Sequence, residues 1–388
     1  MREPDGLTSR SVPISSKIHA NPNIGFAWLR MIGAITVIVD HSMPLLHPQR
    51  LTIFPASWHM SPGYIALMAF FAMSGYQIQD SWVRDPSWWR FSARRLLRIM
   101  PPLLVVLLVT VFVIGPLVTT WSAHDYWTNL QTWRYLVGTT VLFYLQHLLP
   151  GVFTENPYPW SVNGAIWTLP MELLGYGLVL VAGLVVLAGA GRWVVVVLLG
   201  GMVYADTVLH ATFEYHGAGG SLLEVPIGST VSFLVPFVLG MLLHAYRDKI
   251  PLRPWAAMVL FAVYLALSQT PASRYLLAAS AAYGAITLAT HWPKKLEAGG
   301  PHVYGSYGTY IWGFPIQQLL ILAGVRQVWL LILLAVPASY VVGRLSWEYV
   351  EKPTQRLRRH LRPPAPVRRP VAAPPQLPVT AATPLRRS

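Results

Sequence analysis

The feature that most limits how this chain can fold is a series of ten apolar runs, each close to the length that crosses a bilayer. A transmembrane helix needs about 20 apolar residues, because the hydrocarbon layer is roughly 30 Å thick. The runs lie near residues 26–46, 60–80, 101–119, 165–187, 192–209, 227–245, 254–270, 274–291, 304–323 and 328–349. They predict an all-α polytopic membrane protein with about ten transmembrane helices around a polar cavity.

The composition agrees with a chain surrounded by lipid. Hydrophobic residues make up 54% of it and charged residues 11%, whereas a soluble domain carries about 25% charged residues. There is no cysteine, which excludes disulfides, iron–sulfur clusters and a cysteine nucleophile. The spacing of the histidines indicates no metal site, and we expect neither a metal nor a tightly bound cofactor.

The net charge of +14 is placed asymmetrically along the chain. If the apolar segment 133–149 stays outside as a re-entrant or interfacial helix, 23 of the 29 Lys and Arg residues fall on the cytoplasmic side. Basic loops of membrane proteins prefer that side. We therefore expect ten spans, one exterior helix, both termini in the cytoplasm and no binding to nucleic acid.

The two ends of the chain differ in character from the apolar middle. Residues 1–25 are polar and lack the apolar core of a signal peptide, so we expect a cytoplasmic extension. Residues 26–352 form the predicted transmembrane domain. Residues 353–388 are rich in Pro, Ala and Arg without apolar periodicity, which predicts a disordered cytoplasmic tail that can lie against anionic lipid.

The first apolar run contains ionisable side chains. Arg30 and His41 are eleven residues apart, so on a helix they share one face about 16 Å apart along the axis. Asp40 projects about 100° away from His41. An ionisable residue at membrane depth is a functional candidate. The alternatives are that Arg30 merely extends to the cytoplasmic surface and that His41 is structural.

A stripe of arginines precedes the third apolar run. In "WWRFSARRLLRIMPP", Arg90, Arg94 and Arg98 recur every four residues and Arg95 lies beside them, so they line one side of a helix. Guanidinium groups bind phosphate oxygens in a bidentate manner, which suits the phosphates of coenzyme A. The alternative is a basic anchor at the membrane surface.

Five segments together resemble the acyltransferase-3 family of membrane O-acyltransferases. They are "LR-x10-H", "FFAMSGY", "RRLLRIMPP", "NGAIWTLPMELLGY" and "SYGTYIWGFPIQQ", and they occur in the family's order between about residues 25 and 353. The late motif is similar to that of a subgroup of the family. The resemblance implies an enzyme of the bacterial cytoplasmic membrane. It would transfer acetyl, or alternatively succinyl or another short acyl group, from cytosolic acyl-CoA to a hydroxyl of an envelope carbohydrate or glycolipid.

The resemblance also implies roles for the residues within these segments. Many members of the family carry a histidine where this chain has Gly313, and Gln317 or Gln318 could take over its role. The implied catalytic residues are Arg30, His41 and Glu172; the implied CoA-binding residues are Arg90, Arg94, Arg95 and Arg98; the implied substrate-binding residues are Trp167, Tyr307, Tyr310, Gln317 and Gln318.

Acyl transfer to a hydroxyl requires a base for the hydroxyl proton and a positive or hydrogen-bonding group for the oxyanion. Neutral His41 suits the role of base. We expect Glu172, early in the 165–187 run, to lie at the depth of His41 near the outer leaflet. There it would orient the imidazole or bind acceptor hydroxyls, unless it is a structural acid paired with a residue such as a tyrosine.

A second class of function is also consistent with ionisable residues inside the membrane. In a transporter or flippase for a lipid-linked glycan or small molecule, Arg30, His41 and Glu172 would line the path of the substrate or a proton. A purely structural membrane partner is a third possibility. The arginine stripe favours the enzyme, because a transporter has no need of a phosphate site there. The sequence does not predict an oligomeric state.

Overall fold

The computed structural model describes residues 24–54, 61–212, 220–296 and 303–361. Within these ranges the chain is mostly helical, and its one sheet is a two-residue antiparallel pair, β1 (Ser221–Leu222) with β2 (Val225–Pro226). Five helices are long and apolar enough to cross a membrane: Ile24–Leu46, Trp88–Val118, Gly164–Leu187, Ile227–Ala245 and Val328–Leu357. The fold is therefore all-α and typical of a membrane protein.

The helices of the first half of the chain are, in order, α2 (Ile24–Leu46), α3 (Pro62–Arg84), α4 (Trp88–Val109), the π-helical η2 (Thr110–Ile114), α5 (Gly115–Val118), α6 (Ala123–Thr128), α7 (Leu130–Val141), the 3-10 helix η3 (Gly164–Thr168) and α8 (Leu169–Leu187). Those of the second half are α9 (Val194–Thr212), α10 (Ile227–Ala245), α11 (Pro254–Ala266), α12 (Ser273–Thr290), α13 (Ser306–Leu322), α14 (Val328–Ser346), the π-helical η5 (Trp347–Glu351), α15 (Lys352–Leu357) and η6 (Arg358–Leu361).

Each of the ten apolar runs coincides with a helix. Only five of these helices meet the length and hydropathy that a span requires, so the number of ten spans stays a prediction. The segment 133–149 does not form a long helix. Its helix α7 has 12 residues, about 18 Å, which is too short to cross the hydrocarbon layer.

Local sequence signals fix where several helices begin. The hydroxyl of Ser61 accepts a hydrogen bond from the backbone N–H of Tyr64 (3.0 Å), and Pro62 occupies the first turn of α3. Asn129 caps α7 in the same way, by accepting from the N–H of Gln131 (2.8 Å). Such side chains satisfy N–H groups that have no partner within the helix.

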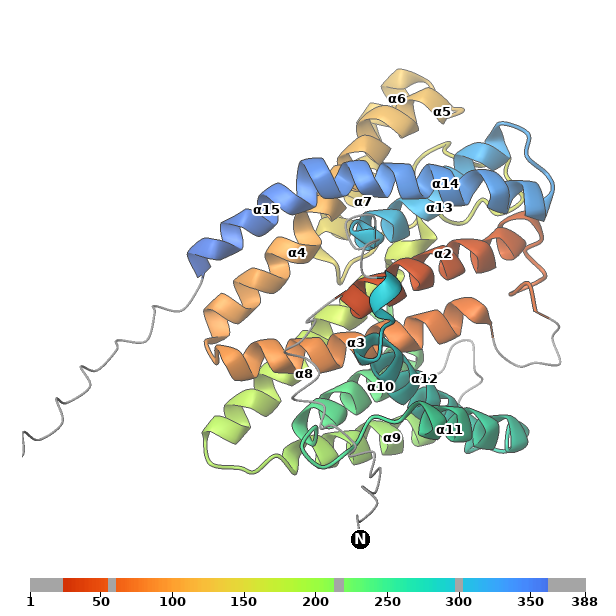
Figure 1. The fold of residues 1–388 in the computed structure, drawn as a ribbon. Helices are drawn as coiled ribbons and strands as arrows, with labels where there is room; N and C mark the ends of the chain where they lie inside the picture. Colours follow the sequence, from red (N-terminus) through yellow and green to blue (C-terminus); the bar gives the residue numbers. More distant parts are fainter. Residues whose placement is uncertain (1–23, 55–60, 213–219, 297–302, 362–388) are drawn as a thin grey trace, which may run out of the picture.

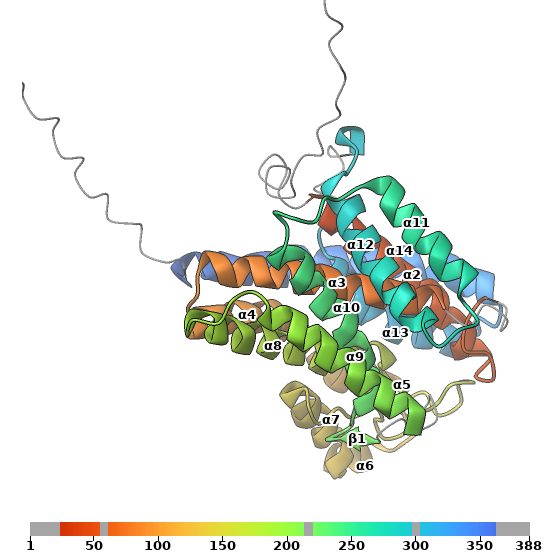
Figure 2. The ribbon, with the colours of Figure 1, turned by 90° about the horizontal axis from the view of Figure 1, so that it is seen from below.

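Glycines allow the central helices α3 and α10 to cross closely. A Cβ atom on Gly75 would collide with the carbonyl oxygen of Phe237, and a Cβ atom on Gly240 would collide with that of Ala72. In lipid, helices associate mainly through such close backbone packing, because the bilayer removes most of the hydrophobic driving force. This crossing holds α3 in the middle of the bundle, between α2, α8 and α10 (Figures 1 and 2).

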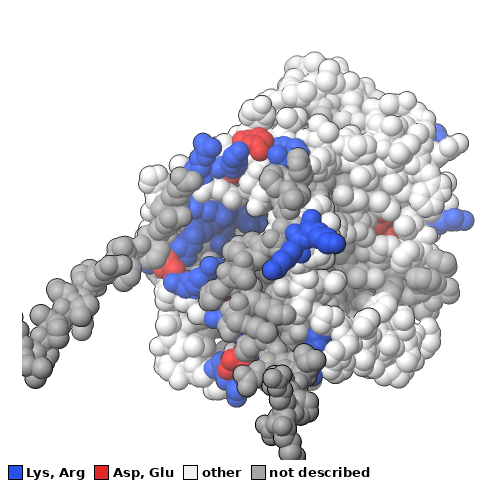
Figure 3. All heavy atoms as spheres, in the orientation of Figure 1, with Lys and Arg blue, Asp and Glu red and all other residues white. Residues whose placement is uncertain are grey.

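The two ends of the bundle differ in charge. In Figure 1 the turn from α3 to α4, the turn from α8 to α9 and helix α15 lie at the left, whereas the connections from α2 to α3 and from α13 to α14 lie at the right. Figure 3, in the same orientation, shows Lys and Arg side chains gathered towards the left. The asymmetry agrees with the charge distribution along the sequence.

The described residues include both ends of the predicted transmembrane domain, 26–352. The first helix begins at Ile24, two residues before the predicted start of the domain. The last helix continues through α15 and η6 to Leu361, so the disordered tail predicted from residue 353 begins too early. Apolar periodicity ends near residue 349, so the sequence pattern does not predict this extension. The predicted extension 1–23 and the remaining tail 362–388 lie outside the described residues.

Candidate active site

A cavity in the centre of the bundle brings together polar residues from five helices. It has a volume of about 80 Å³, which leaves room for several water molecules. Its walls are mostly apolar and include Phe70 and Phe71 of α3. The polar side chains that line it are Arg30 of α2, Ser74 of α3, Arg98 of α4, Thr168 and Glu172 at the start of α8, and Ser306, Tyr307 and Tyr310 of α13.

Within this cavity one hydroxyl links a cation to an acid. Arg30 donates from Nη2 to Ser74 Oγ (3.3 Å), and the Ser74 hydroxyl donates to Glu172 Oε1 (3.5 Å). The hydroxyl of Tyr176 donates to the same carboxylate oxygen. Charged groups at membrane depth require such partners. The chain of contacts orients Arg30 towards the cavity, so Arg30 does more than extend to the surface.

Two tyrosines of α13 fix the opposite wall of the cavity. Tyr307 donates to the backbone oxygen of Ile99 (3.1 Å), and Tyr310 donates to that of Ala165 (2.8 Å). The Tyr310 hydroxyl also lies 3.0 Å from that of Thr168. These bonds join α13 to α4 and to the start of α8. They explain why residues far apart in the sequence meet at one place.

The arginines of the stripe fall into two sets with different contacts. Arg90 makes two hydrogen bonds to Asp85 (3.0 and 2.6 Å), and Arg94 makes one (2.6 Å). The bonds from Arg90, followed by those from Arg94, lower the pKa of the Asp85 carboxyl to about 2. Arg98 instead lines the cavity. Asp85 therefore anchors the outer part of the stripe, and the inner part faces the site.

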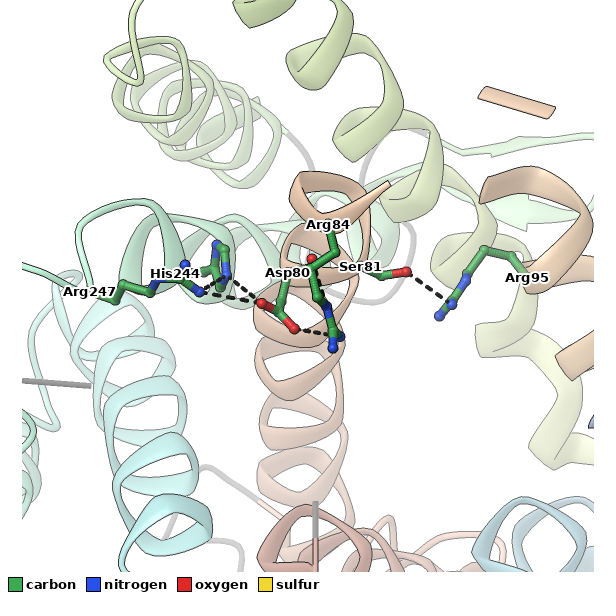
Figure 4. Close-up of polar contacts among 6 residues, drawn as sticks. All are labelled: Asp80, Ser81, Arg84, Arg95, His244 and Arg247. Atoms are coloured by element: carbon green, nitrogen blue, oxygen red, sulfur yellow. Dashed lines mark hydrogen bonds and ion pairs between the residues drawn. The ribbon is translucent and has the colours of Figure 1, made fainter. Parts of the chain in front are cut away.

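A second acid neutralises further arginines beside the stripe. Asp80, in the last turns of α3, pairs with Arg84 (2.6 Å) and Arg247 (3.3 Å), and it lies 3.3 Å from His244 (Figure 4). One residue along, the Ser81 hydroxyl accepts from Arg95 Nη2 (3.4 Å; Figure 4). Arg95 thus points towards the end of α3, where a neutral hydroxyl and not the Asp80 carboxylate holds it.

Several guanidinium groups near the cavity have no acidic partner, or have nitrogens without a hydrogen bond, among the described residues. Within the described part of the chain, Arg30, Arg95, Arg98 and Arg358 make no ion pair. The nitrogens that are buried without a hydrogen-bond partner among these ranges include Arg30 Nε, Arg94 Nε and Nη2, Arg95 Nε, and Arg358 Nε and Nη2. Because a buried cation without a partner is costly, this arrangement is typical of a site for an anionic ligand.

His41 lies outside this cavity, further along α2. Its ring meets the ring of Phe314 edge-on, with 5.6 Å between the centroids, and Phe314 is one turn of α13 beyond Tyr310. Among the described residues no hydrogen bond to His41 is formed. Asp40 points elsewhere, as expected: it accepts from Thr52 (2.8 Å) and from the N–H of Gly63 (3.2 Å).

The predicted depth of Glu172 is wrong. Glu172 shares the cavity with Arg30 and contacts Ser74, three turns of α2 away from His41. The prediction placed the start of the 165–187 run at the outer surface. In the structure this helix starts inside the bundle, because Asn163, which precedes η3, donates to the backbone oxygen of Ile311 (2.9 Å) in the middle of α13.

Comparison with known proteins agrees with this geometry. The acyltransferase-3 family model, described as an acyltransferase domain, matches residues 23–346. The chain belongs to the acyltransferase-3 family. An O-acetyl transferase of Shigella phage Sf6 is 27% identical over 339 residues, which cover 84% of this chain and 94% of that protein. Nodulation protein 10 of Rhizobium leguminosarum bv. viciae is 28% identical over 373 residues, 87% of this chain and 94% of that protein. No solved structure gives a significant match.

This acyltransferase-3 protein is thus a membrane O-acyltransferase, as its sequence motifs indicated. The structure explains one departure from the family pattern. At Gly313, where many members were expected to carry histidine, an added Cβ atom would lie 2.6 Å from Cγ1 of Ile38. A side chain at this position would require the Ile38 side chain to move, so the present packing leaves no space for the histidine.

The two glutamines of the late motif make structural contacts in this acyltransferase. Gln317 donates to the backbone oxygen of Ile38 and to Ser42 Oγ (both 2.8 Å). Gln318 donates to the backbone oxygens of Tyr158 (2.8 Å) and Ser161 (2.9 Å). Both side chains are fully buried and neither lines the cavity. Their role in substrate binding stays a prediction.

Three further residues of the acyltransferase differ from what its sequence indicated. Trp167 of η3 packs edge-on against Phe233, with 5.9 Å between ring centroids, and does not line the cavity. Ser74 was missed as a site residue although it lies in the quoted "FFAMSGY" motif. Arg358 was missed because it lies beyond the last apolar run, and it also lies beyond the segment that the family model matches.

Proposed function

We propose that this membrane O-acyltransferase takes an acetyl group from cytosolic acetyl-CoA and transfers it to a hydroxyl of an envelope carbohydrate or glycolipid. The phage relative named as an O-acetyl transferase supports acetyl as the acyl group. The enzyme lies in the bacterial cytoplasmic membrane with both termini in the cytoplasm. The accumulation of Lys and Arg at one end of the bundle supports that orientation (Figure 3).

The assignment of acyl-CoA as the donor rests on the arginines at the cavity. Other arginines at this end of the molecule are neutralised by Asp80 and Asp85. Arg95 and Arg98, by contrast, have no ion pair within the described ranges, and Arg98 reaches the cavity. Coenzyme A carries a diphosphate and a further phosphate, which match guanidinium groups in charge and geometry. The phosphates bind at this turn, and the pantetheine arm passes through the cavity, so that the acyl thioester at its end lies towards His41.

Arg30 and His41 act on different reactants, Arg30 on the acyl donor and His41 on the acceptor. About 16 Å of helix separates them, so the two side chains act on different parts of the reactants. Arg30, oriented through Ser74 and Glu172, binds the donor. His41 accepts the proton of the acceptor hydroxyl as its oxygen attacks the thioester carbonyl carbon. The new C–O bond forms, the C–S bond breaks, and CoA leaves as the thiolate.

Binding of acetyl-CoA to the purified protein tests the donor site. We expect the Arg95→Ala/Arg98→Ala variant to bind acetyl-CoA at least about 100-fold more weakly, since each charge-assisted hydrogen bond contributes about 1.5–3 kcal/mol. The matched control is Arg84→Ala/Arg356→Ala, which removes two charges from exposed positions of α3 and α15. Calorimetry with equal affinity in parental protein and the Arg95/Arg98 variant would contradict the assignment.

A further inference from the structure

The segment that follows α14 returns to the arginine stripe. After Ser346 the helix passes through the π-helical turn η5 and continues as α15 and η6, and Figure 1 shows α15 beside the start of α4. A hydrogen bond joins the two: Arg94 donates from Nη1 to the backbone oxygen of Leu361 (3.3 Å). The residues beyond 346 lie outside the family match, yet η5, α15 and η6 pack against α4, the helix that carries the arginine stripe.

Arg358 is a half-buried cation of this segment. Its Nε and Nη2 atoms are buried without a hydrogen-bond partner among the described residues. Two positions earlier on the same turn, Arg356 is exposed. The segment therefore turns one arginine towards the solvent and the other into the molecule. A buried guanidinium without partners is costly. The burial of the Arg358 nitrogens therefore requires an interaction that compensates this cost.

The charges around Arg358 make that cost higher. Burial, and then the neighbouring guanidinium groups of Arg98 and Arg95, lower the pKa of Arg358 to about 9, so the group is still charged at neutral pH. The charges of Arg95 and Arg98 thus act on Arg358, with the buried carboxyl of Glu351 acting in the opposite sense. None of the three arginines has an ion pair within the described ranges. A phosphate among them would neutralise the repulsion and supply the missing hydrogen-bond acceptors.

We propose that Arg358 is a donor-binding residue that, together with Arg95 and Arg98, contacts a phosphate of acyl-CoA. The inference rests on the proposed function, because it assumes that acyl-CoA is the ligand of this end of the cavity. It adds a contribution from the far end of the chain: the extension η5, α15 and η6 completes a phosphate site whose other residues come from α4.

The first measurement compares acetyl-CoA affinity in Arg358→Ala, Arg358→Lys and the parental protein by calorimetry. Arg358→Ala should bind about tenfold or more weakly, as expected for one lost charge-assisted bond pair. Arg358→Lys keeps the charge without the planar fork and should fall in between. The control Arg356→Ala removes the same charge from an exposed position of the same segment and should bind as the parent does. Equal affinity in Arg358→Ala and Arg356→Ala would overturn the inference.

Thermal unfolding separates a binding role from a structural one. Because the Ala variant removes a repelling charge, its melting temperature without ligand should equal or exceed that of the parent. The rise in melting temperature that acetyl-CoA produces should shrink. A variant that melts lower without ligand, and gains as much from acetyl-CoA as the parent, would make Arg358 structural and overturn the inference.

The same variants show whether a negative result contradicts the proposed function or only this inference. They also show whether the phosphate at Arg358 belongs to CoA or to a lipid headgroup. If the parental protein binds no acetyl-CoA, the proposed function fails, and the inference fails with it. If Arg95→Ala/Arg98→Ala loses acetyl-CoA and Arg358→Ala does not, only the inference fails. Vesicles containing phosphatidylglycerol provide the other source of phosphate. Loss of phosphatidylglycerol binding in Arg358→Ala with unchanged acetyl-CoA affinity would assign Arg358 to lipid and overturn the inference.

Discussion

Arg30 of α2 and Glu172 of α8 are joined through a single hydroxyl, that of Ser74 on α3. Neither charged side chain forms an ion pair within 4 Å in the described part of the chain. A neutral side chain thus sets the direction of this cation. Since Arg30 lines the proposed path of the thioester, its orientation should matter for transfer more than for folding.

Replacing Ser74 with alanine tests this link. Without the hydroxyl, Arg30 loses its acceptor and Glu172 loses one donor, so we expect acyl transfer to fall by about tenfold, the range for one hydrogen bond to a charged group. The acetylated fraction of envelope glycans, measured by mass spectrometry at matched protein levels, reports the effect. Ser92→Ala is the control, because among the described residues Ser92 bonds only to the backbone oxygen of Trp88. Parental transfer by Ser74→Ala would show that the link is not needed.

The close approach of α2 and α13 predicts the effect of filling Gly313. In Gly313→Ala the new methyl group would meet Ile38, and overpacking of this kind costs about 1–3 kcal/mol. We expect a lower melting temperature in detergent. Gly284→Ala on α12 is the matched control, since no atom lies within 4 Å of its added Cβ and alanine favours a helix by up to about 1 kcal/mol. Equal melting temperatures for the two variants would contradict the packing.

Asp85 predicts a dependence of stability on acid pH. Its folded-state pKa of about 2 lies below the value of about 3.9 expected for an unfolded chain. Its contribution to the free energy of unfolding is therefore complete above about pH 4 and is lost as the pH falls towards about 2. Chemical unfolding of the parental protein and Asp85→Asn should show a steeper loss in the parent over this range. Parallel curves would mean that the pairing with Arg90 and Arg94 adds no stability.

The proposed orientation can be tested with single cysteines, because the native chain has none. A cysteine at Arg84, at the end of α3, should be labelled only from the cytoplasmic side by an impermeant maleimide. A cysteine at Ser221, in β1, should be labelled only from outside. Lys249, after α10, decides the topology of the second half of the chain. If Lys249 were labelled from outside and Ser221 from the cytoplasmic side, the segment 133–149 would have to cross the membrane.

Much of the fold was predictable because lipid imposes strong constraints on sequence. Apolar runs of spanning length mark the helices, and charged residues inside them are so costly that each one is informative. Arg30 was found for this reason, Arg98 was found through the four-residue spacing of the arginine stripe, and Glu172 was found through the family motif. The structure brings all three to one cavity. The two tyrosines, Tyr307 and Tyr310, were found through the family motif and lie in the same cavity.

The residues that were missed or misplaced lack such a signal. Ser74 is small and neutral, so its presence in an apolar helix does not indicate a functional site. Arg358 stands in a basic, proline-rich stretch that resembles a tail, and only its burial distinguishes it from Arg356. The depth of Glu172 depends on where the chain re-enters the bundle before η3, and that depends on the tertiary bond from Asn163 to α13. Periodicity does not contain this information.

The most direct test of the proposed reaction is acyl transfer by His41→Ala, measured as acetylated envelope glycan at matched protein levels and alongside acetyl-CoA affinity. Because His41 lies outside the cavity and forms no hydrogen bond among the described residues, the variant should fold and should bind acetyl-CoA as the parent does. Its transfer should fall by about 10² to 10⁴, the usual contribution of a positioned base. A folded His41→Ala protein that acetylates its acceptor at the parental rate would contradict the proposed mechanism.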